Sequence, residues 1–357
     1  MADNPARGGT IVPAITNRRV LLRSRPAGEP KPTDFEIADA PLPAPGDGEV
    51  LCRTIYLSLD PYMRGRMNDV KSYAPSVELG QPMVGGTVSE VVDSRHPAFQ
   101  AGDFVLGYGG WQAYHVARPA ATPGPFGPLK LDPAAAPIST ALGVLGMPGM
   151  TAYVGLLDLG QPKAGETVVV SAAAGAVGSA VGQLAKIKGC RAVGVAGSPA
   201  KCEYVVKELG FDACVSHRSA DLFAALKEAC PKGIDVYFDN VGGEVLRTVL
   251  RLVNPFARIP LCGLISQYNA PEPPPGPNLG PVLINRVTIR GFIVSDHVNR
   301  LPAFLADCGR WVREGRLKYR EDVVEGLDQA PRAFIGLLRG ENLGKLIVKV
   351  GPDPTVG

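Results

Sequence analysis

A glycine-containing turn between a β-run and a helical pattern is the segment of this sequence best suited to chemistry. The run Thr167–Ser171 leads into Ala173, Gly175 and Gly178, and a helical pattern follows. This spacing is the dinucleotide-binding fingerprint with alanine in place of the first glycine. Gly175 would let the backbone approach a pyrophosphate, and the N–H groups of the helix start would face that anion. We therefore predict a dinucleotide site.

The segment after the next β-run indicates which dinucleotide binds. Sites specific for NAD usually place Asp or Glu at the end of this second strand, about 20 residues on, where the acid binds the ribose 2′-hydroxyl. Here Arg191–Val195 is followed by Ser198 and Lys201, with no acid between Ala196 and Lys201. A hydroxyl and a cation suit a 2′-phosphate, which a carboxylate would repel. The sequence therefore predicts NADPH, although Lys201 could also be an ordinary solvated helix residue.

Two contrasting patterns along the chain predict an α/β protein with two domains. The first 140 residues are rich in β-runs separated by Pro and Gly, which predicts a barrel-like or sandwich domain. From residue 141 to 316, strands alternate with helices, as in a doubly wound parallel sheet. Residues 317–357 hold one helix and one strand, and we expect them to fold back onto the first domain.

The expected elements follow from these patterns. The β-runs of the first part are Arg19–Arg25, Glu49–Leu59, Val84–Val92 and Phe104–Val116. Those of the second part are Thr167–Ser171, Arg191–Val195, Cys214–Val215, Asp235–Asp239, Arg258–Leu261 and Val287–Val294. The helices there are Ala176–Lys188, Ala200–Leu209, Ser219–Ala229, Glu244–Leu252 and Leu301–Glu314, and the tail adds a helix, Ala330–Leu338, and a strand, Lys345–Val350.

The bulk composition excludes several classes of partner. Of 357 residues, 45% are hydrophobic and 20% charged, and the net charge is only +3, so neither a nucleic acid nor a membrane surface is expected to bind. Met1–Ile15 lacks the apolar core of a signal peptide, and the longest apolar stretch, Val168–Val181, is too short to cross a bilayer. We expect a cytoplasmic protein.

The cysteines and histidines predict no metal site. Seven cysteines are scattered without a C-x-x-C pair, and the four histidines lack metal-ligand spacing. A zinc alcohol dehydrogenase is therefore disfavoured.

Six sequence blocks carry a resemblance to a known family. They are Tyr56–Met67, Leu145–Tyr153, Ser171–Gly178, Phe238–Gly243, Cys262–Asn269 and Gly340–Lys345. The chain from Asn17 to Val350 resembles the zinc-independent medium-chain dehydrogenase/reductases of the leukotriene/prostaglandin reductase type. Within that family it is most similar to the bacterial NADPH-dependent curcumin reductases and the plant alkenal double-bond reductases.

The resemblance implies a fold and a set of cofactor contacts. It implies a GroES-like β-barrel catalytic domain made of residues 1–140 and 317–357, and a Rossmann domain, 141–316, that binds NADPH without zinc. The implied cofactor residues are Gly175, Ala176, Val177, Gly178, Ser198, Lys201, His217, Asn240, Cys262, Gly263, Leu264, Ile265, Ser266, Gln267, Tyr268, Phe292, Ile293, Val294 and Asn342. His217 stands where mammalian members carry a Tyr beside the 2′-phosphate. Asn240 could instead cap a turn, and Phe292–Val294 could be sheet core.

The implied activity is reduction of the carbon–carbon double bond of α,β-unsaturated ketones and aldehydes. Hydride adds to the β-carbon while negative charge grows on the carbonyl oxygen, so a hydrogen-bond donor must face that oxygen. Tyr268 resembles the family's catalytic tyrosine and is the candidate donor, and Tyr62 would fix the carbonyl from the barrel domain. We also expect the proline-rich loop Asn269–Pro281 to wall the substrate site. Either tyrosine could instead be buried with its hydroxyl satisfied.

Other functions stay open on the sequence alone. A related zinc-free enzyme could reduce quinones or a carbonyl group, and a crystallin-like protein could bind NADPH without turnover. The family commonly forms homodimers, in which the strand Thr288–Val294 would pair across a two-fold axis.

Overall fold

The alternating strands and helices from residue 167 onward fold into one parallel sheet, as predicted. The structure, a computed structural model, describes residues 15–119 and 128–356; the segment Met1–Ile15 lies outside them except for Ile15. The strands occur in the order β10-β9-β8-β11-β12-β13. They are β8 (Thr167–Ser171), β9 (Arg191–Ala196), β10 (Ala213–Ser216), β11 (Ile234–Phe238), β12 (Val253–Leu261) and β13 (Thr288–Gly291).

The order of these strands reverses between β8 and β11, because β9 and β10 extend the sheet on one side and β12 and β13 on the other. In parallel sheets a ligand binds outside the carboxyl ends of the strands at such a reversal. The helices of this domain are α3 (Ala176–Ile187), α4 (Pro199–Lys207), α5 (Leu222–Ala229), α6 (Gly243–Leu250), α7 (Gly280–Ile284) and α8 (Leu301–Arg313), with the short helical turns η4 (Ile265–Gln267) and η5 (Val294–Arg300).

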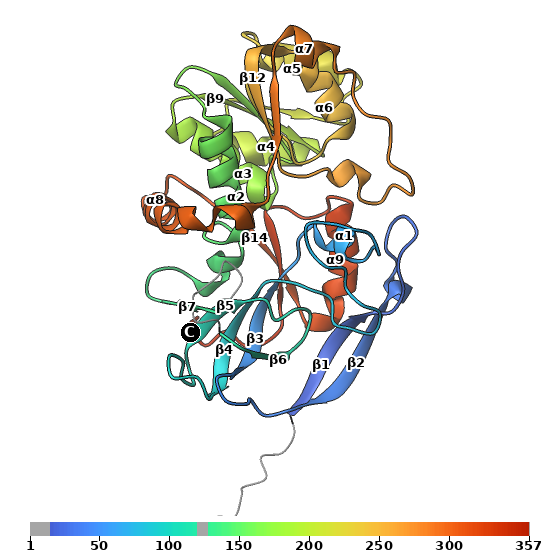
Figure 1. The fold of residues 1–357 in the computed structure, drawn as a ribbon. Coiled ribbons are helices and arrows are strands. Elements are labelled where there is room, and N and C mark those ends of the chain that lie inside the picture. The colour runs from blue at the N-terminus through green and yellow to red at the C-terminus, as the bar shows by residue number, and fades with distance from the viewer. Residues whose placement is uncertain (1–14, 120–127, 357) are drawn as a thin grey trace, which may run out of the picture.

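The second sheet combines both ends of the chain. Its order is β14-β15-β3-β4-β5-β7, and β6 pairs with β3. Strand β15 pairs antiparallel with β3, so Val348 lies opposite Leu57, and the tail folds back onto the first domain as expected (Figure 1). The borders at residues 140 and 316 stay a prediction. The strands are β3 (Val50–Ser58), β4 (Thr87–Ser94), β5 (Phe104–Gly107), β6 (Tyr114–Ala117), β7 (Leu129–Leu131), β14 (Glu321–Glu325) and β15 (Lys345–Lys349).

The remaining elements cover or connect these sheets. Strands β1 (Ile15–Leu22) and β2 (Phe35–Leu42) form a separate antiparallel pair. Helix α9 (Ala330–Leu338) buries one face in the same apolar cluster as β1 and β3. The others are α1 (Met63–Arg66), α2 (Met147–Tyr153), η1 (Pro32–Asp34), η2 (Ile138–Leu142), the π-helical η3 (Val154–Gly160) and η6 (Leu327–Gln329).

Several element predictions were wrong. The predicted strand Val287–Val294 is shorter, because after Gly291 the ring of Phe292 turns into the core, 6.2 Å between centroids from Phe238. The first strand begins earlier than Arg19, and β2 was not predicted. In β2, buried Phe35 is followed mainly by small or exposed residues, which leaves little apolar alternation for a prediction to use.

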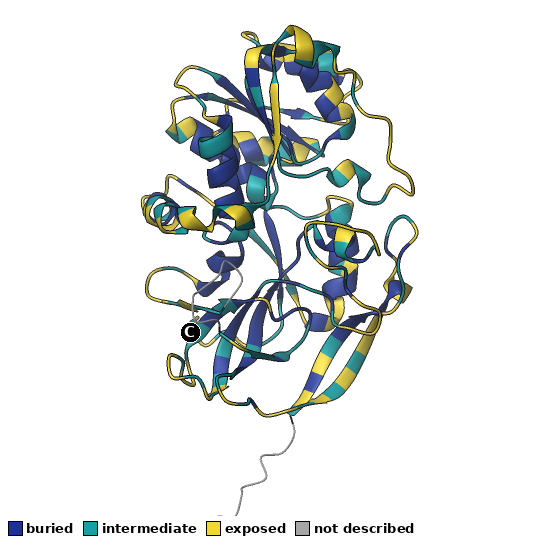
Figure 2. Cartoon of the chain, in the orientation of Figure 1, coloured by how far each residue is buried: buried dark blue, intermediate teal, exposed yellow. Residues whose placement is uncertain are grey.

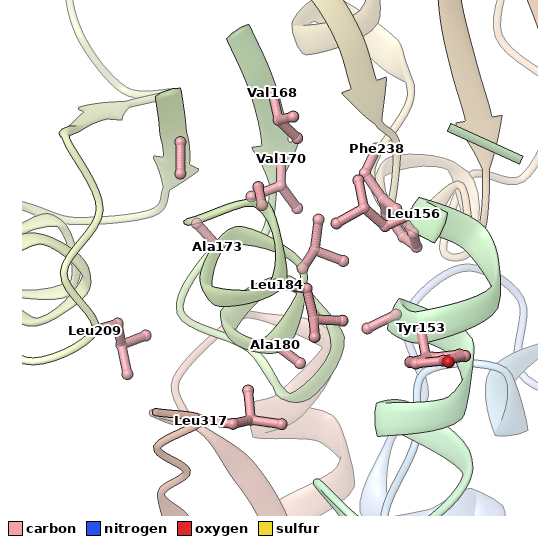
Figure 3. Packing of buried hydrophobic residues seen from close by; sticks show 14 of the residues in the cluster. Tyr153, Leu156, Val168, Val170, Ala173, Ala180, Leu184, Leu209, Phe238 and Leu317 are labelled. Carbon is pink, nitrogen blue, oxygen red and sulfur yellow. The ribbon is translucent and has the colours of Figure 1, made fainter. Parts of the chain in front are cut away.

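The core of the parallel-sheet domain holds the start of α3 in place. All five residues of β8 are buried, and α3 buries one face against them. Figure 3 shows Val170 and Leu184 in one cluster with Tyr153 of α2. Full burial of each aliphatic side chain of this size contributes about 1.5–3 kcal/mol. Within the described residues, no helix combines the length and apolar character required to cross a membrane.

Candidate active site

A cleft of about 710 Å³ lies between the two domains. The parallel sheet contributes the residues that follow β8, β9, β10, β11 and β12, at the reversal of strand order. The barrel domain contributes the segment from Leu59 to Tyr62 and, from the tail, Asn342 and Gly344 to Leu346. One wall of the cleft therefore consists of the strand ends of the parallel sheet, and the facing wall consists of segments of the barrel domain.

The turn between β8 and α3 has the geometry that dinucleotide binding requires. Gly175 is the extended residue before the first turn of α3, and no side chain caps the helix there. The first N–H groups of this helix are thus available to an anion. A Cβ on Gly178 would lie 2.3 Å from the carbonyl oxygen of Ala172, so only glycine fits. Ala176 and Val177, between the two glycines, also line the cleft.

Cationic and protonatable side chains gather at the far end of this wall. Lys201, His217 and Arg218 all line the cleft. Burial first, and then the charge of Arg218, lowers the pKa of Lys201, while Asp322 opposes the shift. Burial, Arg218 and Lys201 together lower the pKa of His217. An anion placed here would offset the repulsion that lowers the pKa values of Lys201 and His217. Arg218 was not predicted.

Ser198 has a structural role beside its predicted contact with the 2′-phosphate, which stays a prediction. Its hydroxyl caps α4 by accepting the N–H of Lys201 at 3.3 Å. Although the structure describes this residue, it is not among those that line the cleft. Ser198 thus positions Lys201, whose ammonium donates to the carbonyl of Gly340 at 2.6 Å and so reaches the tail of the chain.

The turn after β11 is fixed by a network of short hydrogen bonds. The side-chain amide of Asn240 donates to the carbonyl of Ser171 at 2.8 Å, which joins the ends of β8 and β11. Asp239 is fully buried and accepts from Tyr237 at 2.7 Å and from the N–H of Gly242 at 2.8 Å. Burial raises the pKa of this carboxyl. These hydrogen bonds hold the turn that places Asn240 in the lining of the cleft.

Most of the predicted residues after β12 and β13 also line the cleft. These are Cys262, Gly263, Ile265, Ser266, Tyr268, Phe292, Ile293 and Val294, with Asn342 from the tail. Leu264 and Gln267, both described by the structure, do not. The side chain of Leu264 instead packs at Gly242, where an added Cβ would lie 2.6 Å from its Cδ2. Burial raises the pKa of the Cys262 thiol to about 12.

Phenols from both domains meet at the other end of the cleft. Tyr268 follows η4, and its hydroxyl accepts the N–H of Leu264 at 3.3 Å. Tyr62, before α1, donates to the hydroxyl of Tyr108 at 3.3 Å. Burial is the main cause that raises the pKa of both Tyr268 and Tyr62, so both remain protonated at neutral pH. The cleft therefore offers phenol donors at this end.

Three further residues of this phenol-lined wall were not predicted. Tyr73 and Tyr108 line the cleft although they are 59% and 43% exposed. The guanidinium of Arg66 lies 5.8 Å from the ring centroid of Tyr62 and 5.2 Å from that of Tyr73. Neither Tyr73 nor Tyr108 belongs to a motif block with a stated role, so no local pattern indicated their position in the cleft.

The proline-rich loop does not wall the cleft as expected, since none of its residues, all described, is among the lining. Its first residue, Asn269, accepts from Arg64 at 3.2 Å. Arg64 is only 3% exposed and also donates to the carbonyl of Gly28 at 2.7 Å. The loop is thus tied to the barrel domain immediately after Tyr268.

The described residues contain no group of three or more His, Cys, Asp or Glu side chains that could hold a metal ion.

Comparisons with known proteins agree with this geometry. Residues 18–123 match a family described as the N-terminal domain of oxidoreductase, and residues 176–308 match one described as zinc-binding dehydrogenase. The chain is 52% identical to an NADPH-dependent curcumin reductase of Escherichia coli (strain K12), over 94% of this chain and 98% of that protein. It is 42% identical to a 2-alkenal reductase (NADP(+)-dependent) of Nicotiana tabacum, over 95% and 99%.

A solved structure shares the fold across the same length. The crystal structure of CurA in complex with NADPH from Vibrio vulnificus superposes with a TM-score of 0.89 at 49% identity, covering 94% of this chain and all of that chain. The protein therefore belongs to the zinc-independent medium-chain dehydrogenase/reductase family, among its NADPH-dependent reductases of α,β-unsaturated carbonyl compounds.

Proposed function

We propose that the protein reduces the carbon–carbon double bond of curcumin-type or alkenal-type enones, with NADPH as the source of hydride. One observation carries the proposal: a single cleft joins the open start of α3 and a cluster of cations to a wall of protonated phenols. The first wall suits a phosphorylated dinucleotide, and the second suits an acceptor whose oxygen gains negative charge.

The residues present fit NADPH. Gly178 leaves a cradle that a Cβ would fill, and the helix N–H groups beside Gly175 suit the diphosphate. Lys201, His217 and Arg218 would hold the 2′-phosphate, and Arg218 adds to the predicted set. The remaining contacts would come from Ala176, Val177, Asn240, Cys262, Gly263, Ile265, Ser266, Tyr268, Phe292, Ile293, Val294 and Asn342. When bound, NADPH supplies the hydride.

Tyr268 is the proposed donor to the carbonyl oxygen of the enone. Its hydroxyl accepts a hydrogen bond from Leu264, and no bond donated by it is found among the described residues, so its own proton is available. Because burial raises its pKa, the phenol remains a donor as negative charge grows on the substrate oxygen. Tyr62, on the facing wall, would fix the same carbonyl from the barrel domain.

A homodimer formed through β13 is the proposed assembly. Strand β13 is at the edge of the parallel sheet, and all four of its residues are exposed. Beside it in the chain, Leu283 and Ile284 of α7 are 80% and 69% exposed, and Figure 2 shows much of this end of the domain in yellow. A second copy related by a two-fold axis would extend the sheet and cover these side chains.

We also propose that the protein acts in the cytoplasm. All seven cysteines, each within the described residues, are free thiols, which supports an enzyme of a reducing, intracellular compartment.

The product of a reaction with deuterated NADPH tests the proposed reaction. We expect an enone to yield the saturated ketone with deuterium on its β-carbon, because hydride adds to that carbon. Mass spectrometry and NMR of the product locate the label. Deuterium on the carbinol carbon of an allylic alcohol, or turnover of quinones alone, would contradict the proposal in favour of a carbonyl or quinone reductase.

Replacement of Lys201 tests the 2′-phosphate site. We expect Lys201→Ala to raise the KM for NADPH by roughly 10–100-fold, the loss of one charge-assisted hydrogen bond, and to leave activity with NADH nearly unchanged. Initial rates with both cofactors measure this. Lys207→Ala is the matched control, because Lys207 is exposed on the same helix and paired with Glu203. Equal effects of Lys201→Ala on both cofactors would place the phosphate elsewhere.

Replacement of Tyr268 tests the proposed donor. We expect Tyr268→Phe to lower kcat by about 100-fold, since one preorganised donor to an oxyanion is lost. The affinity for NADPH, measured by fluorescence titration, should stay close to that of the native protein. Tyr204→Phe on α4 serves as the control, because Tyr204 is outside the cleft lining. A Tyr268→Phe variant with the native kcat would eliminate this residue as donor.

Charge introduced on α7 tests the dimer. We expect the double substitution Leu283→Glu, Ile284→Glu to produce monomers, because it places charge in an apolar contact. Light scattering after size-exclusion chromatography gives the mass. Leu305→Glu, an exposed apolar position on α8, should leave the mass unchanged. A native protein that elutes as a monomer would refute the assembly.

A further inference from the structure

A buried ion pair forms part of the cleft wall and has no role in the function described so far. The ammonium of Lys345 donates to Asp60 at 2.8 Å and to the carbonyl of Leu59 at 2.7 Å. The two side chains are only 5% and 9% exposed. The hydroxyl of Ser58 donates to the second oxygen of Asp60. Asp60 and Lys345 both line the cleft, so a charged, hydrogen-bonded unit stands at its edge.

Asp60 leads directly into the turn that presents Tyr62. Its main-chain carbonyl accepts the N–H of Met63 at 3.1 Å, which closes the turn before α1. Both of its carboxylate oxygens are held, one by Lys345 and one by Ser58. The position of Tyr62, two residues further on, therefore follows from the position of this carboxylate.

The backbone beside Lys345 leads to the dinucleotide turn. The N–H of Gly344 donates to the carbonyl of Ala174 at 2.9 Å, and Gly344 pairs with Gly175 in a parallel bridge. Gly344 has a φ of +83°, and a Cβ there would lie 2.2 Å from the carbonyl oxygen of Arg320. A side chain at position 344 would therefore collide with Arg320 of the tail itself, so only glycine lets the tail follow this path beside Ala174.

The ion pair and the backbone bridge therefore connect the phenol-lined wall to the dinucleotide wall through only a few residues. From Ala174 the path runs through one hydrogen bond to Gly344, along the chain to Lys345, and through its side chain to Asp60. A buried ion pair is seldom more stabilising than apolar side chains of the same volume, because its charges lose their hydration. Its hydrogen bonds are directional, however, and a directional contact fixes a distance that apolar packing leaves adjustable.

We propose that Asp60 and Lys345 are positioning residues for hydride transfer, which set the separation between the phenol-lined wall and the dinucleotide wall. Neither residue touches the reacting atoms. They act through Tyr62 on one side and through Gly344 on the other, so that the β-carbon of the enone lies at the right distance from the cofactor. This role rests on the proposed function, since it presumes that an enone binds against Tyr62.

Four variants distinguish a positioning role of the ion pair from an effect of its charge and from an effect on the stability of the fold. Lys345→Met removes the ammonium and leaves the carboxylate unpaired, and the double variant Asp60→Ala, Lys345→Met removes the unit without leaving a buried charge. Asp60→Asn removes one charge but keeps an oxygen that accepts from Lys345, and its NH2 group can donate to the Ser58 hydroxyl in place of the bond that Ser58 donates now. Lys186→Met is the matched control, because Lys186 forms an ion pair of the same 2.8 Å with Asp212 away from the cleft.

Single-turnover rates and isotope effects are the readouts, because loss of fold stability alone does not change an isotope effect. We expect hydride transfer to slow by about tenfold or more in Lys345→Met and in the double variant, since small misplacements of reacting groups are costly. Their primary deuterium isotope effect should rise as chemistry becomes rate-limiting, while the NADPH dissociation constant stays within about threefold. Asp60→Asn should keep the rate within about threefold, because both contacts can persist, the one with Ser58 in the reverse direction.

Two results would overturn the positioning role. One is a folded double variant that transfers hydride at the native rate. The other is a large loss of the hydride-transfer rate in Asp60→Asn, which would show that charge rather than position matters. This variant tests the positioning role even where the other variants do not fold. A native protein that fails to reduce enones would contradict the proposed function instead, so the two failures are distinguishable.

Discussion

The open N-terminus of α3 is the constraint on which the rest of the site depends. The N–H groups there remain available to a ligand because no side chain caps the helix, and Gly178 lets the first turn of α3 lie very close to the carbonyl of Ala172. The buried strand β8 fixes where the helix starts, and the reversal of strand order beside it opens the crevice. The barrel domain then covers part of this crevice with segments from both ends of the chain, so both walls face one cleft.

The two walls of the cleft differ because they have different electrostatic tasks. At one end burial and the charge of Arg218 disfavour the charged forms of Lys201 and His217, a condition that a bound phosphate would relieve. At the other end burial keeps the phenols protonated. The first wall holds like charges whose repulsion a bound phosphate would offset. The second wall provides neutral hydrogen-bond donors that would stabilise negative charge developing on a substrate.

Local patterns predicted the parallel sheet and the dinucleotide turn because each depends on residues close together in the sequence. The alternation of strands and helices, and the spacing of Gly175 and Gly178, are complete within short segments. Residues that reach the cleft through contacts between distant segments left no such local pattern in the sequence. Arg218 follows a strand of only four residues, and Tyr73 and Tyr108 reach the cleft from connecting segments. Ser198 shows that one side chain suits two roles, since a hydroxyl near a predicted phosphate also suits a helix cap, and here it forms that cap.

The thiol of Cys262 lies in the cleft, where an enone could inactivate the protein by alkylating it. Enones are Michael acceptors, and a thiolate adds to the same β-carbon that receives hydride. The thiolate, not the thiol, is the reactive nucleophile, so a cysteine beside such substrates is a hazard. Because burial raises the pKa of Cys262 to about 12, its sulfur stays protonated near neutrality. This protonation would disfavour alkylation of Cys262 by an enone bound in the cleft.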